Sequence, residues 1–164
     1  MAIVNRVVGD MQVTGALVMG SVTLPNSSVT NASVAAAAGI DADKLDHQHS
    51  KCYAQANSAA SDETRIIHVA RAAGTVEDFV AGSIAKAVGD ATCTVDLKKN
   101  GTTILSAVIT LDSGNTNRVA EAGTVSTAAY VSGDVFEVVI DGTIGTGTLP
   151  TGVFCQAVFF EAAA

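Results

Sequence analysis

The sequence predicts a mainly β fold, an antiparallel β-sandwich or jelly-roll-like domain preceded by an extended N-terminal arm. Three observations support this prediction. Short runs rich in β-branched residues follow one another from Thr64 onward, with Gly, Asp, Asn and Ser between them. No segment repeats its apolar residues with the 3.6-residue period of a long helix. The stretch 21–38 is polar, low in complexity and interrupted by Pro25, which is typical of an arm rather than a core.

Residues 1–60 are expected to form the arm, which would dock on sister subunits or on a larger surface. In the stretch that begins at Ser21, the residues Val22, Val29 and Val34 stand singly among Ser, Thr and Asn, so they cannot bury one another. Asp41 is placed as a helix N-cap, which predicts a short helical turn near residues 41–46. Disorder of this polar segment is the alternative. The interface residues expected in the arm are Val22, Leu24, Val29, Val34, Ile40 and Leu45.

The sandwich is expected to span residues 61–164, after a linker or loosely held strand at 54–62. The expected strands are 66–70, 79–88, 92–98, 102–111, 115–120, 124–130, 135–140 and 153–160. Gly82 suggests a bulge or bend in the second of these strands. The clearest element is a hairpin, because Asn100-Gly101 between two alternating runs is a preferred two-residue turn. Four of the seven aromatic residues lie in the last two strands, which are therefore expected at the centre of the sandwich.

The composition argues against several classes of function. A chain of 164 residues allows one compact domain plus an arm. Nine Lys and Arg residues against sixteen Asp and Glu give a net charge of −7, the wrong sign for holding nucleic-acid phosphates. No segment resembles a signal peptide or a membrane span, so we expect assembly in a cytoplasm and no membrane partner. Because 48% of the residues are hydrophobic but only 4% aromatic, we expect small apolar side chains to be covered by another chain.

The sequence also lacks the motifs of common enzymes. It contains no GxSxG, HExxH or P-loop, and no GxGxxG after a strand, so neither a catalytic residue nor an organic cofactor is predicted. The Gly-rich segment 141–148 has no following helix that could hold a phosphate, which indicates a surface loop. The three cysteines are odd in number and widely spaced. This predicts reduced, mostly buried thiols rather than disulfides or a zinc knuckle.

His47 and His49 are the one candidate metal site. Alternate residues of an extended strand face the same side, so both imidazoles could face one point. Two histidines are too few for a tight site on one chain, but three copies around a threefold axis would supply six nitrogens, a set suited to iron or nickel. A solvated or hydrogen-bonded pair without metal is the alternative. His68 is expected to have a packing role in its apolar strand.

Three segments resemble small virion proteins of tailed bacteriophages, which are labelled capsid decoration, cement or head-fibre proteins. The segments are 34–49 (VAAAAGIDADKLDHQH), 95–101 (VDLKKNG) and 133–138 (GDVFEV). The first is the specific part of a similarity that extends from about Val34 to Phe160. The resemblance implies a homotrimer that sits on the capsid lattice, with the major capsid protein as its partner. It implies no catalytic residue.

The expected function is therefore structural: a trimeric decoration protein that binds and stabilises the phage head, located on the capsid surface after assembly in the host cytoplasm. A tail-fibre or receptor-binding tip protein is the first alternative, and it would be present in fewer copies per particle. A carbohydrate-binding module, with a host-surface glycan as its ligand, is an alternative of another class. The absence of Trp and the presence of only two Tyr leave that module little aromatic surface for stacking on a sugar.

Overall fold

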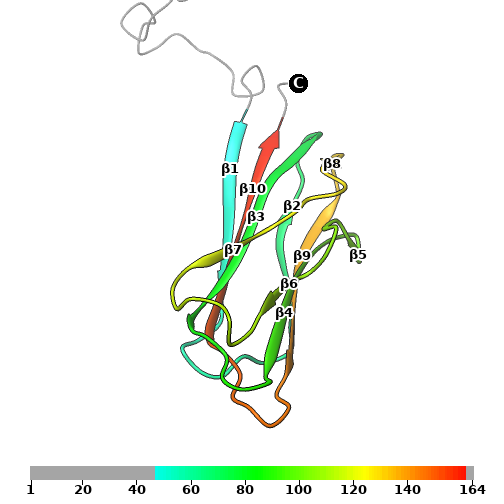
Figure 1. Cartoon of the computed structure of the whole chain (residues 1–164). Coiled ribbons are helices and arrows are strands. Elements are labelled where there is room, and N and C mark those ends of the chain that lie inside the picture. Colours follow the sequence, from blue (N-terminus) through cyan, green and yellow to red (C-terminus); the bar gives the residue numbers. More distant parts are fainter. Residues whose placement is uncertain (1–46, 162–164) are drawn as a thin grey trace, which may run out of the picture. The chain divides into compact units, whose positions relative to one another are not determined.

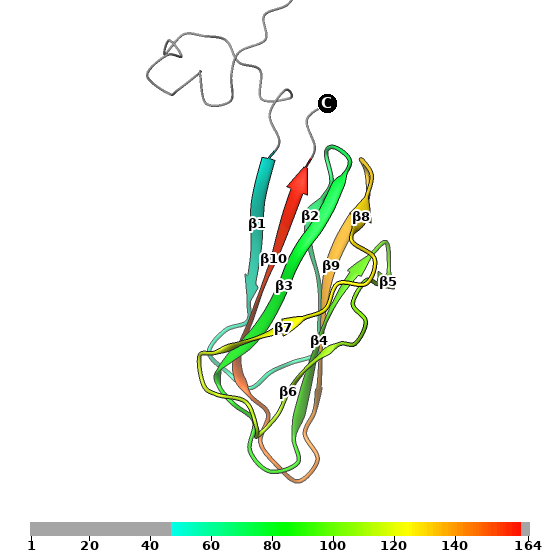
Figure 2. The same cartoon turned by 45° about the horizontal axis from the view of Figure 1, so that its top comes forward.

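The computed structural model describes residues 47–161, which fold into two antiparallel sheets packed face to face. The first sheet has the order β1 (His47–Ala54), β10 (Thr151–Glu161), β3 (Gly74–Ala85) and β7 (Ala120–Gly123), with β8 (Ala129–Tyr130) also paired to β3. The second has the order β2 (Glu63–Val69), β9 (Val135–Thr143), β4 (Thr92–Lys99) and β5 (Thr102–Thr103), with β6 (Ile109–Leu111) also paired to β4. Figures 1 and 2 show the two layers from different angles. The predicted antiparallel β-sandwich is confirmed.

The two aromatic-rich strands lie at the centre of the sheets, as predicted. β10 runs between β1 and β3, and β9 runs between β2 and β4. Alternate side chains of both strands point into the space between the sheets, where Phe136 and Phe159 are fully buried with their ring centroids 4.8 Å apart. Burying a phenyl ring stabilises the fold by about 1.5 to 3 kcal/mol. Within residues 47–161 no helix is long and apolar enough to cross a membrane.

The predicted hairpin is present, although its second strand is interrupted. Asn100 and Gly101 both have positive φ angles, 51° and 80°, as a two-residue hairpin turn of this type requires. The expected strand 102–111 is divided into β5 and β6. The physical reason is that Ile104 and Leu105 are both buried, and neighbouring residues of a regular strand cannot both face the core.

The predicted boundary between arm and sandwich requires correction. β1 pairs with β10 along its whole length, from His47↔Glu161 to Ala54↔Phe154, so residues 47–54 belong to the sandwich and not to the arm. The sequence of β1 did not indicate a strand because it contains few apolar residues, and an edge strand can be held by backbone hydrogen bonds. The predicted helical turn at 41–46 lies outside the described residues. So do the predicted interface residues Val22, Leu24, Val29, Val34, Ile40 and Leu45.

Two smaller expectations also differ from the structure. Of the expected strand 115–120, only Ala120 is in a strand, because the preceding residues form a turn in which Asn115 Oδ1 accepts a hydrogen bond from Asp112 N. Gly82 produces no change of register between β3 and β10. A Cβ atom at Gly82 would lie 2.7 Å from Phe154 Cζ, so this glycine instead makes room for an aromatic ring on the outer face of the sheet.

Candidate functional site

The edge strands β1 and β2 bring polar side chains together along one lateral side of the sandwich. β1 is the edge of the first sheet and β2 is the edge of the second. Alternate residues of β1, namely His49, Lys51 and Tyr53, are half-buried, whereas the residues between them are exposed. Glu63 and His68 of β2 are half-buried as well. We call this row of polar side chains from β1 and β2 the polar side of the sandwich.

At the Tyr53 end of the polar side, a hydrogen-bonded group surrounds the carboxylate of Glu63. The Tyr53 hydroxyl donates to one carboxylate oxygen of Glu63, and Arg65 Nε donates to the other. Gln55 Nε2 adds a longer hydrogen bond of 3.3 Å. The Tyr53 hydroxyl lowers the pKa of Glu63, and burial together with Glu63 raises the pKa of Tyr53. Both shifts keep Glu63 ionised and Tyr53 protonated, the forms that this hydrogen bond requires.

At the other end of the polar side, His49, His68 and Glu161 form a second group, the His-His-Glu cluster. His49 Nε2 lies 3.4 Å from His68 Nε2, and His68 Nε2 lies 3.5 Å from Glu161 Oε1. The three residues come from β1, β2 and β10, and therefore from both sheets. The side chains of His68 and Glu161 are only 8% and 14% exposed.

Aromatic packing holds the two imidazoles of the cluster in place. The His49 ring stacks on Phe159 with a centroid distance of 5.6 Å and an interplanar angle of 18°. The His68 ring lies 4.6 Å from Phe159 and 5.9 Å from Phe136. Burial, and then the charges of His49 and Lys51, lower the pKa of His68. The neutral imidazole, which has a free lone pair on one nitrogen, is therefore favoured at neutral pH.

The structure separates the two histidines that were predicted to act together, His47 and His49. His47 is exposed at the start of β1, whereas His49 faces His68 and Glu161 of its own chain. The predicted packing role of His68 agrees with its ring contacts, but its Nε2 atom also has polar neighbours that the sequence did not suggest. Glu161 was missed altogether. The alternation of side chains along β10 could have indicated it, because Glu161 lies on the same side of the strand as the buried Phe159, two residues earlier.

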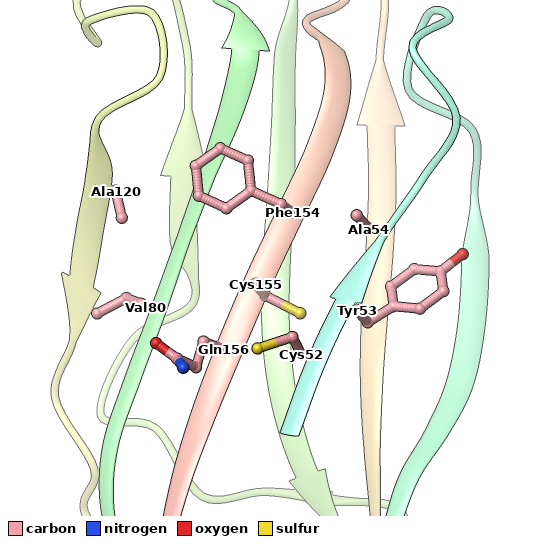
Figure 3. A pocket seen from close by; sticks show the side chains of 8 residues that line it. All are labelled: Cys52, Tyr53, Ala54, Val80, Ala120, Phe154, Cys155 and Gln156. Carbon is pink, nitrogen blue, oxygen red and sulfur yellow. The ribbon is translucent and has the colours of Figure 1, made fainter. Parts of the chain in front are cut away.

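A second candidate surface lies on the outer face of the first sheet. A shallow hollow of about 460 Å³ extends over β1, β10, β3 and β7. Figure 3 shows the ring of Phe154 lying across this face, with Val80 and Ala120 on neighbouring strands. The hollow is lined by Cys52, Tyr53, Ala54, Val80, Ala120, Phe154, Cys155 and Gln156. None of these side chains is charged at neutral pH, so this uncharged face is suited to contact with another apolar surface.

Burial keeps two of the three cysteines in the thiol form. Burial raises the pKa of Cys93 to about 11 and that of Cys155 to about 12. Both thiols therefore stay protonated at neutral pH, whereas a nucleophilic cysteine needs its thiolate form. Cys52 is exposed, so the predicted burial holds for two of the three cysteines. All three are free, as predicted.

Comparison with known proteins assigns no family to this chain. No protein-family model matches the chain. No curated protein matches it significantly. The function therefore has to be argued from the surfaces and side chains of the molecule, because a sandwich fold alone hosts many functions.

Proposed function

We propose that this protein is a structural component of a bacteriophage virion, a homotrimeric decoration protein that binds the major capsid protein and stabilises the head. The observation that supports this proposal best is the uncharged hollow around Phe154 on the outer face of the first sheet. Such a face is suited to contact between subunits. The proposal places the protein on the capsid surface and assigns it no catalytic role.

The charge of the chain explains why this face is the one expected to meet a sister subunit. Each copy has a net charge of −7, so copies repel one another unless they approach through an uncharged surface. The face around Phe154 meets this condition. The exposed small side chains of Ala54 and Ala120, on strands at either side of Phe154, allow close approach of a second backbone, and a half-buried aromatic residue is a typical anchor of an interface.

The strand order gives a second, weaker argument. Successive strands from β1 to β4 alternate between the sheets, and β10 and β9 then insert beside the two edge strands. We infer from this order a jelly roll, an arrangement found in viral capsid and lectin domains. The fold is thus compatible with a virion protein, and the choice between capsid and sugar binding depends on the side chains.

The aromatic side chains disfavour the carbohydrate-binding alternative. Tyr130 is only 3% exposed, and the hydroxyl of Tyr53 is bonded to Glu63. The guanidinium of Arg65 also lies over the Tyr53 ring, 6.0 Å from its centroid, so one face of this ring is already covered and the chain offers little aromatic surface for stacking on a pyranose. A glycan array with sub-millimolar hits would favour the lectin-like function instead. A tail-fibre position would be favoured by a low copy number per particle in quantitative mass spectrometry of purified virions.

Deletion of the arm tests the proposal directly. Because β1 is part of the sandwich, the truncated chain should begin at His47 rather than at residue 61. Heads of the phage that encodes the protein, prepared without it, are mixed with the full-length or the truncated chain and then sedimented. We expect the full-length chain to bind and the truncated chain to keep its β-type circular dichroism but stay in the supernatant.

Binding of the truncated chain at full occupancy would contradict the division between arm and sandwich. Failure of both chains to bind would contradict capsid decoration itself.

A further inference from the structure

The His-His-Glu cluster contains three potential metal ligands that face one another within a single chain. The His49 and His68 nitrogens and a Glu161 oxygen all lie within 4.8 Å of one another. They come from three strands, and the two rings are fixed by their contacts with Phe159. This is the kind of rigid support that a binding site requires.

In the absence of a cation, the three groups of the cluster compete for one proton on His68 Nε2. His68 Nε2 has two close neighbours, His49 Nε2 and Glu161 Oε1, but a ring nitrogen carries either one proton or one lone pair. If His68 Nε2 is protonated, its single proton is divided between two acceptors. If it is unprotonated, its lone pair faces the Glu161 carboxylate. A cation at the point between the three atoms would satisfy all of them at once.

The separations agree with those between ligands of one small ion. Tetrahedral zinc with bonds of about 2.0 to 2.1 Å to nitrogen or oxygen places its ligand atoms about 3.3 Å apart. The observed pairs are 3.4 Å and 3.5 Å apart. The third pair, His49 with Glu161, lies within 4.8 Å and has to close to a similar separation when an ion binds.

We propose that His49, His68 and Glu161 of one chain bind a divalent transition ion, Zn²⁺ foremost, with water as the fourth ligand. Two imidazoles and one carboxylate form a common three-residue ligand set for zinc. The positive charge of Lys51 lies near the cluster and repels a bound cation. The negative charge of the Glu161 carboxylate attracts the cation and offsets this repulsion. This site differs from the predicted His47/His49 site, because it is complete within one chain and does not use His47.

The bound ion has a structural consequence. His49 and Glu161 belong to the first sheet and His68 belongs to the second, so the ion joins the two sheets at the beginning of β1. Binding to the folded state alone raises its stability in proportion to the logarithm of the ion concentration. Zinc should therefore raise the midpoint of thermal unfolding.

The test uses the full-length chain without a polyhistidine tag, stripped of metal and titrated with Zn²⁺ by calorimetry and with Co²⁺ by visible absorption. We expect one ion per chain and the intense visible bands of tetrahedral cobalt. Glu161→Gln preserves the shape of the side chain and should weaken binding by more than about tenfold, since even the loss of a supporting group around a metal costs at least that much. His68→Asn should do the same. His47→Ala is the matched control and should bind as the unaltered chain does.

Two results would overturn the proposal. One is the absence of Zn²⁺ binding and of the cobalt bands in a chain that circular dichroism shows to be folded. The other is binding that His47→Ala abolishes while Glu161→Gln leaves it intact, which would place the ion on the His47/His49 pair between chains. The thermal midpoint gives an independent readout, because zinc should raise it for the unaltered chain and for His47→Ala but not for Glu161→Gln.

Discussion

The two lateral sides of the sandwich are closed by different kinds of interaction. On the side of β6 and β7, Leu105 and Ile109 are buried, and a backbone bridge joins Leu105 to Val125. Backbone hydrogen bonds of 2.9 Å from Ser106 N to Thr124 O and of 2.7 Å from Ser126 N to Ile104 O close this apolar side further. On the polar side, the side-chain hydrogen bonds between β1 and β2 join His49 to His68 and Tyr53 to Glu63, all of which can gain or lose a proton.

The difference indicates a division of roles within one fold. Backbone bonds and apolar contacts respond little to pH or ions, so the apolar side is expected to supply constant stability. Histidine and carboxylate side chains respond to both. The polar side is therefore one part of the sandwich whose stability pH and ions can change.

The largest expected effect comes from Phe159, which lies in the core and also supports both imidazoles of the cluster. Phe159→Ala should lower the free energy of unfolding by about 3 to 5 kcal/mol, because it removes a fully buried ring and leaves a cavity. Phe154→Ala, on the outer face of the same strand, is the matched control and should cost about 1 kcal/mol in a monomeric chain. Urea unfolding followed by circular dichroism measures both. Equal costs would contradict the assignment of Phe159 to the core. If Phe159→Ala does not fold, Phe159→Leu gives the same comparison with a smaller loss.

A pair of substitutions compares the two sides directly. Leu105→Ala on the apolar side should cost about 2 to 4 kcal/mol, since the side chain is only 4% exposed. Tyr53→Phe on the polar side removes only the hydrogen bond to Glu63 and should cost about 1 kcal/mol. Urea midpoints at neutral pH provide the measurement. A larger loss for Tyr53→Phe than for Leu105→Ala would mean that the polar side is the main closure of the sandwich.

The smallest expected effect is the pH dependence that Glu63 on the polar side contributes. The folded-state pKa of Glu63 is lowered from its ordinary value of 4.5, first by the Tyr53 hydroxyl. The contribution of this carboxylate to stability is therefore full above pH 4.5 and is lost as the pH falls through the folded-state pKa. Unfolding free energies of the unaltered chain and of Glu63→Gln should differ most near neutral pH and converge in acid. A difference that grows on acidification would contradict this account.

The sequence predicted the elements that depend on neighbours along the chain. The Asn100-Gly101 turn and the alternation of β10 follow from local conformation and periodicity, and both are present. β1 was assigned to the arm because an edge strand needs few apolar residues. The partnership of His49 with His68 and Glu161 was not predictable, since it depends on which strands become neighbours across two sheets.

The excess of small apolar residues predicted that a surface would be covered by another chain, and this stays a prediction. The uncharged hollow that we propose for this contact lies where the register places Phe154 opposite Gly82 and Ala54 opposite Phe154. This pairing joins segments that are far apart in the chain, so it cannot be predicted from the periodicity of a single strand.

The most direct test of the proposed function is the mass of the full-length protein in solution, measured by light scattering coupled to size exclusion. One chain has a mass of 16.5 kDa, and a homotrimer predicts three times that value. Phe154→Asp adds a negative charge to the uncharged face and should reduce the mass to that of one chain while circular dichroism stays unchanged. A monomeric mass for the unaltered chain at all concentrations would contradict the proposed self-association through this face. So would a trimer that Phe154→Asp leaves intact.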